Sequence, residues 1–144
     1  MLPSVKTVQS AQELEEARDL RIAVFVEEQG VPLEEELDDL DDTAFHAVAI
    51  HDGSVVGTGR LLLDTATQAQ IGRMAVSQAF RRQGIGSKVL TFLEEAAHSR
   101  GIRRVTLDAQ SYVTEFYARH GYLEEGEPFI EVGIPHVKMG KALG

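Results

Sequence analysis

Residues 74–87 contain the residue types best suited to binding a phosphate group. They read Met-Ala-Val-Ser-Gln-Ala-Phe-Arg-Arg-Gln-Gly-Ile-Gly-Ser, so an apolar stretch runs into a turn with two arginines and two glycines. An amphipathic helical pattern follows, and free backbone N–H groups at the start of a helix bind anions. Gly84 and Gly86 let the backbone approach a ligand closely because neither has a Cβ atom. Since Arg81 and Arg82 add positive charge, the segment predicts a phosphate-binding turn.

Two other nucleotide-binding loops do not match this segment. A Walker-type loop requires a glycine, four intervening residues and then Gly-Lys-Ser/Thr, and the chain has no such run. A dinucleotide-binding loop requires a third glycine at the position of Val89. An ordinary helix start can also carry a lone Gly-x-Gly, so the pattern alone leaves that alternative open.

Acidic and basic residues are segregated along the chain. The net charge of −9 argues against a nucleic-acid partner, because neutralising phosphates requires clustered lysines and arginines. Residues 27–42 contain nine acids and no base, and they are called the acidic segment below. Residues 65–93 contain no acid but four bases, Arg73, Arg81, Arg82 and Lys88. The pattern indicates either chance surface patterning or an anion site beside a separate site that tolerates a cation.

The hydrophobic periodicity predicts the elements that position the turn. Ser10 and Glu13 form a capping-box pattern that opens a helix ending near Gly30, and Asp52-Gly53 supplies the turn of a hairpin. The expected strands are 5–8, 45–50, 54–63, 70–76, 102–107 and segments between 121 and 139, and the other expected helices are 85–101 and 111–120. This order predicts one mixed α/β domain over residues 1–144.

Composition excludes several kinds of chemistry. The chain has no cysteine, which excludes disulfides, thiolate metal sites and an acyl-cysteine intermediate, and nothing else in the sequence supports a metal site. No apolar run is long enough to span a bilayer. The first 16 residues lack a long apolar stretch and become acidic early, so we expect no secretory signal. We therefore expect a cytoplasmic protein without a membrane or nucleic-acid partner.

Two motifs resemble those of one family. Residues 81–86 are similar to the Arg/Gln-x-x-Gly-x-Gly/Ala signature of the GNAT superfamily of acyl-CoA N-acyltransferases, and residues 115–122 resemble its Phe-Tyr-x-x-x-Gly-Phe motif. The resemblance extends from about residue 45 to residue 139. Residues 24–32 and 133–136 resemble a bacterial branch that includes ElaA-like proteins. The resemblance implies a GNAT-like fold, in which helices flank a central, mostly antiparallel sheet.

The resemblance also implies acetyl-CoA as co-substrate. In the family, the signature holds the pyrophosphate of coenzyme A, and the strand before it pairs with the pantetheine arm. The implied cofactor-binding residues are Met74, Ala75, Val76, Arg81, Arg82, Gln83, Gly84, Ile85, Gly86, Ser87, Gln110, Phe116 and Tyr117. Many relatives have Asn at the position of Gln110, whose amide offers the same donor and acceptor with altered geometry.

The catalytic roles follow from the same resemblance. It implies that the Val76 N–H points at the thioester oxygen and that Tyr117 protonates the departing thiolate. The alternative for Tyr117 is an aromatic residue that only packs. His136 is the first candidate for the general base, followed by Glu131 and Glu28. Each of the three has an alternative, a structural histidine or a solvated glutamate.

These observations predict an N-acetyltransferase that moves acetyl from acetyl-CoA to a primary amine of a small molecule. The acidic segment either attracts a cationic amine or forms an exposed, solubilising surface. The alternatives are a non-catalytic acyl-CoA-binding sensor and a protein-lysine acetyltransferase. Because related proteins often dimerise, a homodimer is also among the expected states.

Overall fold

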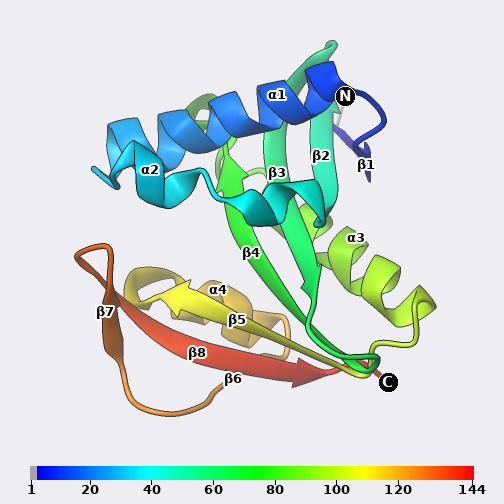
Figure 1. Ribbon diagram of the computed structural model, residues 1–144, viewed down its shortest axis with the longest axis vertical. Helices are drawn as coiled ribbons and strands as arrows, with labels where there is room; N and C mark the ends of the chain where they lie inside the picture. The colour runs from blue at the N-terminus through cyan, green and yellow to red at the C-terminus, as the bar shows by residue number, and fades with distance from the viewer. Residues whose placement is uncertain (1–2) are drawn as a thin grey trace.

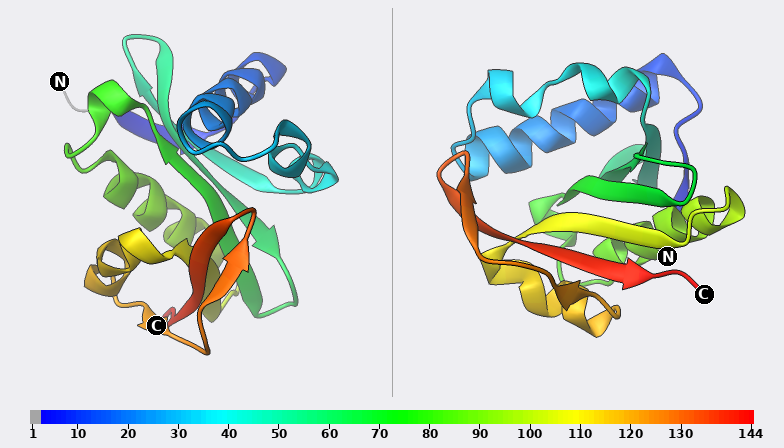
Figure 2. Two further views of the ribbon diagram at one scale, coloured as in Figure 1. Left: turned by 90° about the vertical axis from the view of Figure 1, so that its left-hand side faces the viewer. Right: turned by 60° about the horizontal axis from the view of Figure 1, so that its bottom comes forward.

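A twisted sheet with helices on both faces forms the framework of the protein (Figures 1 and 2). The computed structural model describes residues 3–144. The first two of the 16 residues in which we expect no secretory signal therefore lie outside the described range. The strands in this range are β1 (Ser4–Thr7), β2 (Phe45–His51), β3 (Ser54–Leu63), β4 (Gln68–Val76), β5 (Arg104–Gln110), β6 (Leu123–Glu124), β7 (Phe129–Glu131) and β8 (Ile134–Ala142). The α-helices are α1 (Ala11–Arg21), α2 (Leu33–Glu36), α3 (Ile85–Ser99) and α4 (Thr114–Arg119). One π-helical segment, η1 (Ile22–Glu28), and three 3₁₀ segments, η2 (Asp39–Asp42), η3 (Gln78–Phe80) and η4 (Ser111–Val113), complete the described elements.

The order of the strands creates an opening in the sheet. The order is β1-β2-β3-β4-β5-β8-β6, with β7 also paired to β8. Among the strands of residues 3–144, β4 and β5 are the one parallel pair, and they pair through Gln68–Gln70 and Arg104–Thr106. Beyond this short register the two strands diverge toward their C-terminal ends (Figure 1). We call this divergence the β4–β5 gap. The mixed, mostly antiparallel architecture that we expected is confirmed.

The helices cover opposite faces of the sheet. Both α1 and α3 pack on β3 and β4, and Figure 2 shows them on the two sides of the strands. The largest apolar cluster lies on the α3 side and includes Val89, Leu93 and Val105. Helix α3 sits close to β3 because Gly57 has no side chain, and a Cβ atom there would lie 2.7 Å from Cγ2 of Ile85.

Local chemistry explains the ends of the predicted elements. Ser10 caps α1 by accepting from the Glu13 N–H at 3.1 Å, as the capping-box pattern predicts. The β2–β3 turn has positive φ at both Asp52 (49°) and Gly53 (79°), so the hairpin prediction is confirmed. Within residues 3–144, no helix is both long enough and apolar enough to cross a membrane.

Three predicted segments differ from the structure. The first helix does not remain α-helical to Gly30, because residues 22–28 form η1. The strand predicted at 102–107 lies at Arg104–Gln110, since Ile102 instead packs into the core and the Arg104 N–H donates to Thr67 O. The helix predicted at 111–120 is divided into η4 and α4.

Candidate active site

The end of β4 turns one peptide group into the β4–β5 gap. The Ser77 N–H donates to Val56 O at 2.8 Å, which makes Gly57 and Val76 a non-hydrogen-bonded pair. The N–H and C=O of Val76 therefore point away from β3, toward β5. Arg81 Nε donates to Val76 O at 3.0 Å from that side. The Val76 N–H thus has the direction that a donor to a group in the gap requires.

A β-bulge gives β4 a second inward-facing peptide group. The β3–β4 register shifts between Thr58 and Arg60, where β4 has one extra residue. Arg73 lies at this bulge with φ of 53°, a left-handed conformation that costs a non-glycine residue about 1–3 kcal/mol. Because successive peptide groups alternate in direction, the N–H of Met74 also faces the gap.

The turn after β4 fits a pyrophosphate group. Gly84 is the N-cap of α3 with φ of 82°, and no side chain caps the helix. The Lys88 N–H makes the first intrahelical bond, to Gly84 O at 3.1 Å, so the preceding N–H groups of residues 85–87 have no partner within the helix. A Cβ atom on Gly84 would meet nothing within 4 Å, so the turn is open to a ligand. Open, unpaired N–H groups at a helix start are the donors that a phosphate binds.

The side chain of Arg81 turns away from this helix start. Its guanidinium pairs with Glu28, with Nη1 2.9 Å from Oε1 and Nη2 3.0 Å from Oε2. Arg82, at φ of 65°, and Gln83 are exposed beside the turn. Most of the groups in this turn that could bind a phosphate are therefore backbone N–H groups, and the Glu28 carboxylate offsets the charge of Arg81.

Two residues at the end of η1 reach both sides of the gap. Glu28 pairs with Arg81 on the β4 side, and Gln29 bonds to Gln110 and Tyr112 on the β5 side. The amides of Gln29 and Gln110 exchange bonds of 3.3 and 2.8 Å. Gln110 keeps one N–H and one lone pair free for a cofactor. We call Glu28 and Gln29 the η1 bridge.

The candidate acid lies on α4, on the face covered by α3. Tyr117 belongs to the main core cluster, and burial raises its pKa to about 12, with a smaller contribution from Tyr112. Phe116 packs edge-on against Tyr117 with ring centroids 5.0 Å apart. Ser87 on α3 lies 2.9 Å from Nε2 of His120, which links the helix start to the end of α4.

The first base candidate has a defined tautomer when it is neutral. His136 Nδ1 lies 2.7 Å from Ile134 O, and since a carbonyl only accepts, Nδ1 carries the proton. Nε2 then has a free lone pair, as a general base requires. Glu131 is exposed on β7, and Glu28 is paired with Arg81.

The acid and base candidates lie on opposite faces of the sheet. Ala109 and Val137 form one cross-strand pair, and both belong to the core on the α3 side. The next pair, Gln110 and His136, must face the other way because side chains alternate along a strand. Gln110 accordingly reaches Gln29 beside α1. Tyr117 therefore lies on one face of the sheet and His136 on the other.

Sequence reasoning missed a buried ion network between α1, the acidic segment and the sheet. Its ion pairs join Arg18, Arg21, Arg60 and Arg73 to Glu36, Asp38 and Asp41. Burial pushes the pKa of Asp41 upward, but hydrogen bonds and charges of Arg21 and other arginines outweigh it and lower that pKa to about 2. Burial raises the pKa of Glu36 above its usual value despite Arg73 and Arg21. The available signal was Arg21, a charged residue on the apolar face of a helix, because such a residue requires a buried partner.

The two segregated charge segments are partly each other's partners. Arg73 pairs with Glu36 and Asp38, and Arg81 pairs with Glu28. The acidic segment is thus neither a purely exposed surface nor wholly free to attract an amine. No group of three or more potential metal ligands comes together among residues 3–144.

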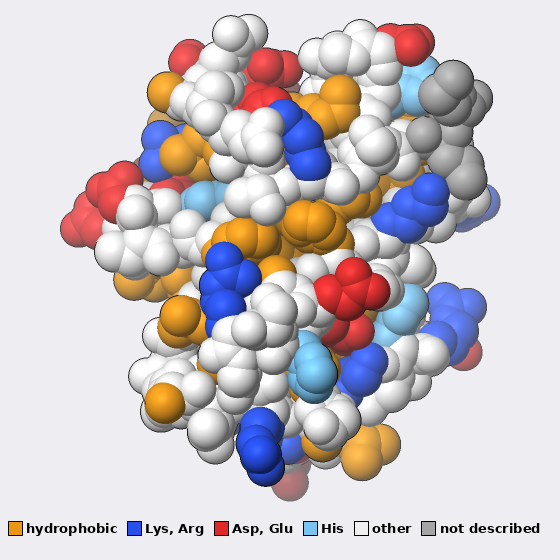
Figure 3. All heavy atoms as spheres, turned by 90° about the vertical axis from the view of Figure 1, so that its right-hand side faces the viewer, with side chains coloured by type: hydrophobic (Ala, Val, Ile, Leu, Met, Phe, Trp, Pro, Cys, Tyr) orange, Lys and Arg blue, Asp and Glu red, His pale blue; other side chains and the backbone are white. Residues whose placement is uncertain are grey.

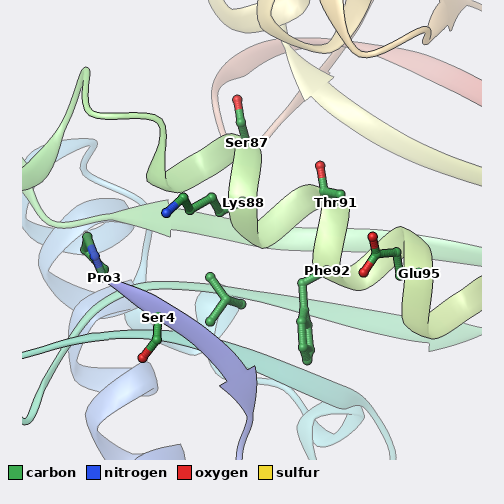
Figure 4. Close-up of a pocket in the computed structure, with 8 residues that line it drawn as sticks. Pro3, Ser4, Ser87, Lys88, Thr91, Phe92 and Glu95 are labelled. Carbon is green, nitrogen blue, oxygen red and sulfur yellow. The ribbon is translucent and has the colours of Figure 1, made fainter. Parts of the chain in front are cut away.

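A shallow pocket of about 460 Å³, open to solvent, lies outside the gap, between β1 and α3. Figure 4 shows Lys88 and Phe92 beside it, whereas Ser87 points away from β1. Figure 3 shows the surrounding face, where hydrophobic side chains gather across the middle between charged ones. The pocket shares only Ser87 with the predicted site.

Comparison with known proteins assigns the family. The model of the acetyltransferase (GNAT) domain matches residues 10–143. The chain belongs to the GNAT acetyltransferases. It is similar to the uncharacterized N-acetyltransferase YjcF of Bacillus subtilis, with 37% identity over 132 residues that cover 90% of this chain and 93% of YjcF. This result confirms three predictions that the sequence motifs imply: the GNAT family, an acyltransferase enzyme, and acetyl-CoA as co-substrate.

Two solved structures show the same fold. Escherichia coli ElaA has a TM-score of 0.87 and 28% identity, covering 97% of this chain and 99% of ElaA. A GNAT family acetyltransferase from Elizabethkingia anophelis with acetyl-CoA bound has a TM-score of 0.79 and 16% identity, covering 98% of each chain. The acetyl-CoA of a GNAT enzyme fits this chain because the turn before α3 offers unpaired N–H groups and no obstructing side chain.

Proposed function

We propose that this GNAT acetyltransferase transfers acetyl from acetyl-CoA directly to a primary amine of a small molecule in the cytoplasm. The observation that carries the proposal is the placement of Tyr117 and His136 on opposite faces of the sheet. Two substrates can then meet in the gap without sharing an entrance. Because the chain has no cysteine, the transfer cannot proceed through an acyl-cysteine intermediate.

The residues divide the chemistry between them. Acetyl-CoA supplies an activated thioester, whose C–S bond breaks as the C–N bond to the amine forms. The N–H groups of Met74 and Val76 donate to carbonyl oxygens of the cofactor in the gap. The N–H that donates to the thioester oxygen stabilises the negative charge that develops on this oxygen. Because the phosphate-binding turn follows β4, a cofactor arm running back along the strand passes Val76 before Met74. Tyr117 gives its hydroxyl proton to the departing sulfur, and Nε2 of His136 takes the proton that the amine loses.

The test is thiol release from acetyl-CoA in the presence of a panel of amines. The panel contains a polyamine, an amino sugar, an amino acid and a lysine peptide. We expect release that depends on one class of small amine and a pH–rate profile that changes in His136→Ala. An unchanged profile would remove His136 as the base. Cofactor binding without release would favour the sensor, and release only with the peptide would favour protein-lysine transfer.

A further inference from the structure

Arg73 combines a strained backbone with a side chain that is paired to the acidic segment. It is the bulge residue of β4, and its φ of 53° is rare for a non-glycine residue in a strand. Such a conformation persists only where the surrounding structure holds it. The residue after it, Met74, presents the second inward-facing N–H of the gap.

The side chain of Arg73 is held by the acidic segment. Its Nε lies 3.1 Å from Glu36 Oε2, and its Nη2 lies 3.3 Å from Asp38 Oδ2. The same Nη2 donates to the backbone oxygens of Glu35 and Glu36, both at 3.2 Å. Three hydrogen bonds from Nη2 and one ion-pair contact from Nε thus tie the guanidinium to one short segment.

The acidic segment is itself anchored, so it can hold Arg73 in place. Arg21, whose side chain is 1% exposed, donates to Glu36 at 2.7 Å. Arg60 on β3 forms a two-bond pair with Asp38, at 2.8 and 2.9 Å. The carboxylates that hold the bulge are therefore tied to α1 and to the neighbouring strand. Paired in this way, they serve the geometry of β4 rather than attracting an amine.

We propose that Arg73 is a positioning residue for acetyl transfer. Through its ion pairs with Glu36 and Asp38 it holds the β4 bulge, so that the Met74 and Val76 N–H groups face the gap in which the thioester lies. The inference rests on the proposed function for the position of the thioester beside β4. It also gives one reason for the segregated charges, since Arg73 belongs to residues 65–93 and its partners Glu36 and Asp38 belong to the acidic segment.

The test is isotope-edited infrared spectroscopy of bound acetyl-CoA labelled with ¹³C at the thioester carbonyl. In the wild type we expect the carbonyl stretch at lower frequency than for free acetyl-CoA, because N–H donors polarise the bond. In Arg73→Gly we expect most of this shift to be lost, although glycine suits the backbone conformation. Arg73→Lys, which keeps the charge but not the planar fork, should retain part of it. Acetyl-CoA affinity should change by less than about threefold, because the turn before α3 supplies most of the phosphate binding.

Asp52→Gly is the matched control, because Asp52 also has a left-handed φ of 49° but lies in the β2–β3 turn. It should keep the full shift. If Arg73→Gly does not fold, Glu36→Gln loosens the same contacts from the other side and should also reduce the shift. A full shift in these Arg73 or Glu36 variants, or none in the wild type, would overturn the proposal. The thiol-release assay tests the proposed function, and the infrared shift tests the role of Arg73. If no amine is acetylated, the infrared shift of bound acetyl-CoA can still be measured, so the two failures are distinguishable.

Discussion

Tyr117 keeps its proton throughout the physiological pH range because burial raises its pKa to about 12. A general acid must be protonated before it acts, and this group satisfies that condition at any ordinary assay pH. The edge-on ring of Phe116 and the surrounding core fix the direction of its side chain. The packing alternative and the acid role are therefore compatible for this tyrosine.

Replacing Tyr117 by Phe separates the two roles. The ring still fills the core, so we expect acetyl-CoA affinity to change little, whereas kcat falls by about 10²-fold through loss of the proton donor. Calorimetry gives the affinity and thiol release gives kcat. An unchanged kcat would leave Tyr117 with a packing role alone.

Residues whose roles depend on their own backbone were predictable, and residues whose roles depend on distant partners were not. Ser10, the Asp52-Gly53 turn and Gly84 behave as their types predict, because capping and positive φ are local properties. Arg73 and Arg81 meet carboxylates 35 and 53 positions away, and no local pattern encodes such pairs. The sequence placed both arginines near the site but did not indicate what they bind.

At the scale of elements, η1 is the feature that sequence periodicity could not show. The apolar spacing through residues 22–26 fits an ordinary α-helix, and a π-helix differs only by wider turns. Its end brings Glu28 and Gln29 across the β4–β5 gap. The η1 bridge therefore depends on backbone geometry that emerges only with tertiary packing.

The η1 bridge predicts that the Arg81 side chain contributes less to acetyl-CoA binding than the backbone N–H groups at the start of α3. Because Glu28 offsets the charge of Arg81, we expect Arg81→Ala to weaken acetyl-CoA binding by less than about fivefold. Glu28→Gln frees that charge and should tighten binding by about twofold. Calorimetric titration at low salt measures both. Complete loss of binding in Arg81→Ala would instead assign the guanidinium a direct pyrophosphate contact.

At the scale of the whole molecule, the buried ion network links stability to pH. The pKa of Asp41 falls from 3.8 to about 2 on folding, so its stabilising effect is present above pH 4 and disappears as the pH falls toward 2. Glu36 acts in the opposite sense, because its raised pKa makes the folded state hold a proton more readily than the unfolded chain. Its contribution therefore declines as pH rises through and above its usual value of 4.5.

Asp41 alone should lower the free energy of unfolding by about 2 kcal/mol between pH 4 and pH 2. Urea denaturation at a series of pH values measures this slope. Asp41→Asn should remove most of it, and Asp42→Asn, whose side chain is 83% exposed, should not. Equal slopes in the wild type and Asp41→Asn would show that other groups control acid unfolding.

The overall architecture was largely predictable because strands and helices alternate in a clear order and two motifs resemble one family. The resemblance implied only that the strand before the turn pairs with the pantetheine arm, and no residue pattern predicted the β4–β5 gap. Local patterns specify each strand, but the length of the β4–β5 pairing depends on the bulge at Arg73 and on packing between β4, β5 and the helices.

Acetyl-CoA binding at the start of α3 is the claim on which the rest depends, and calorimetric titration of acetyl-CoA tests it most directly. Gly84 and Gly101 lie at opposite ends of α3 with φ of 82° and 84°, and a Cβ atom on either meets nothing within 4 Å. Glutamate therefore strains both positions alike, but only Gly84→Glu places a carboxylate at the phosphate-binding turn. We predict binding to the wild type and to Gly101→Glu, and none to Gly84→Glu. Undiminished binding in Gly84→Glu would contradict the placement of the pyrophosphate.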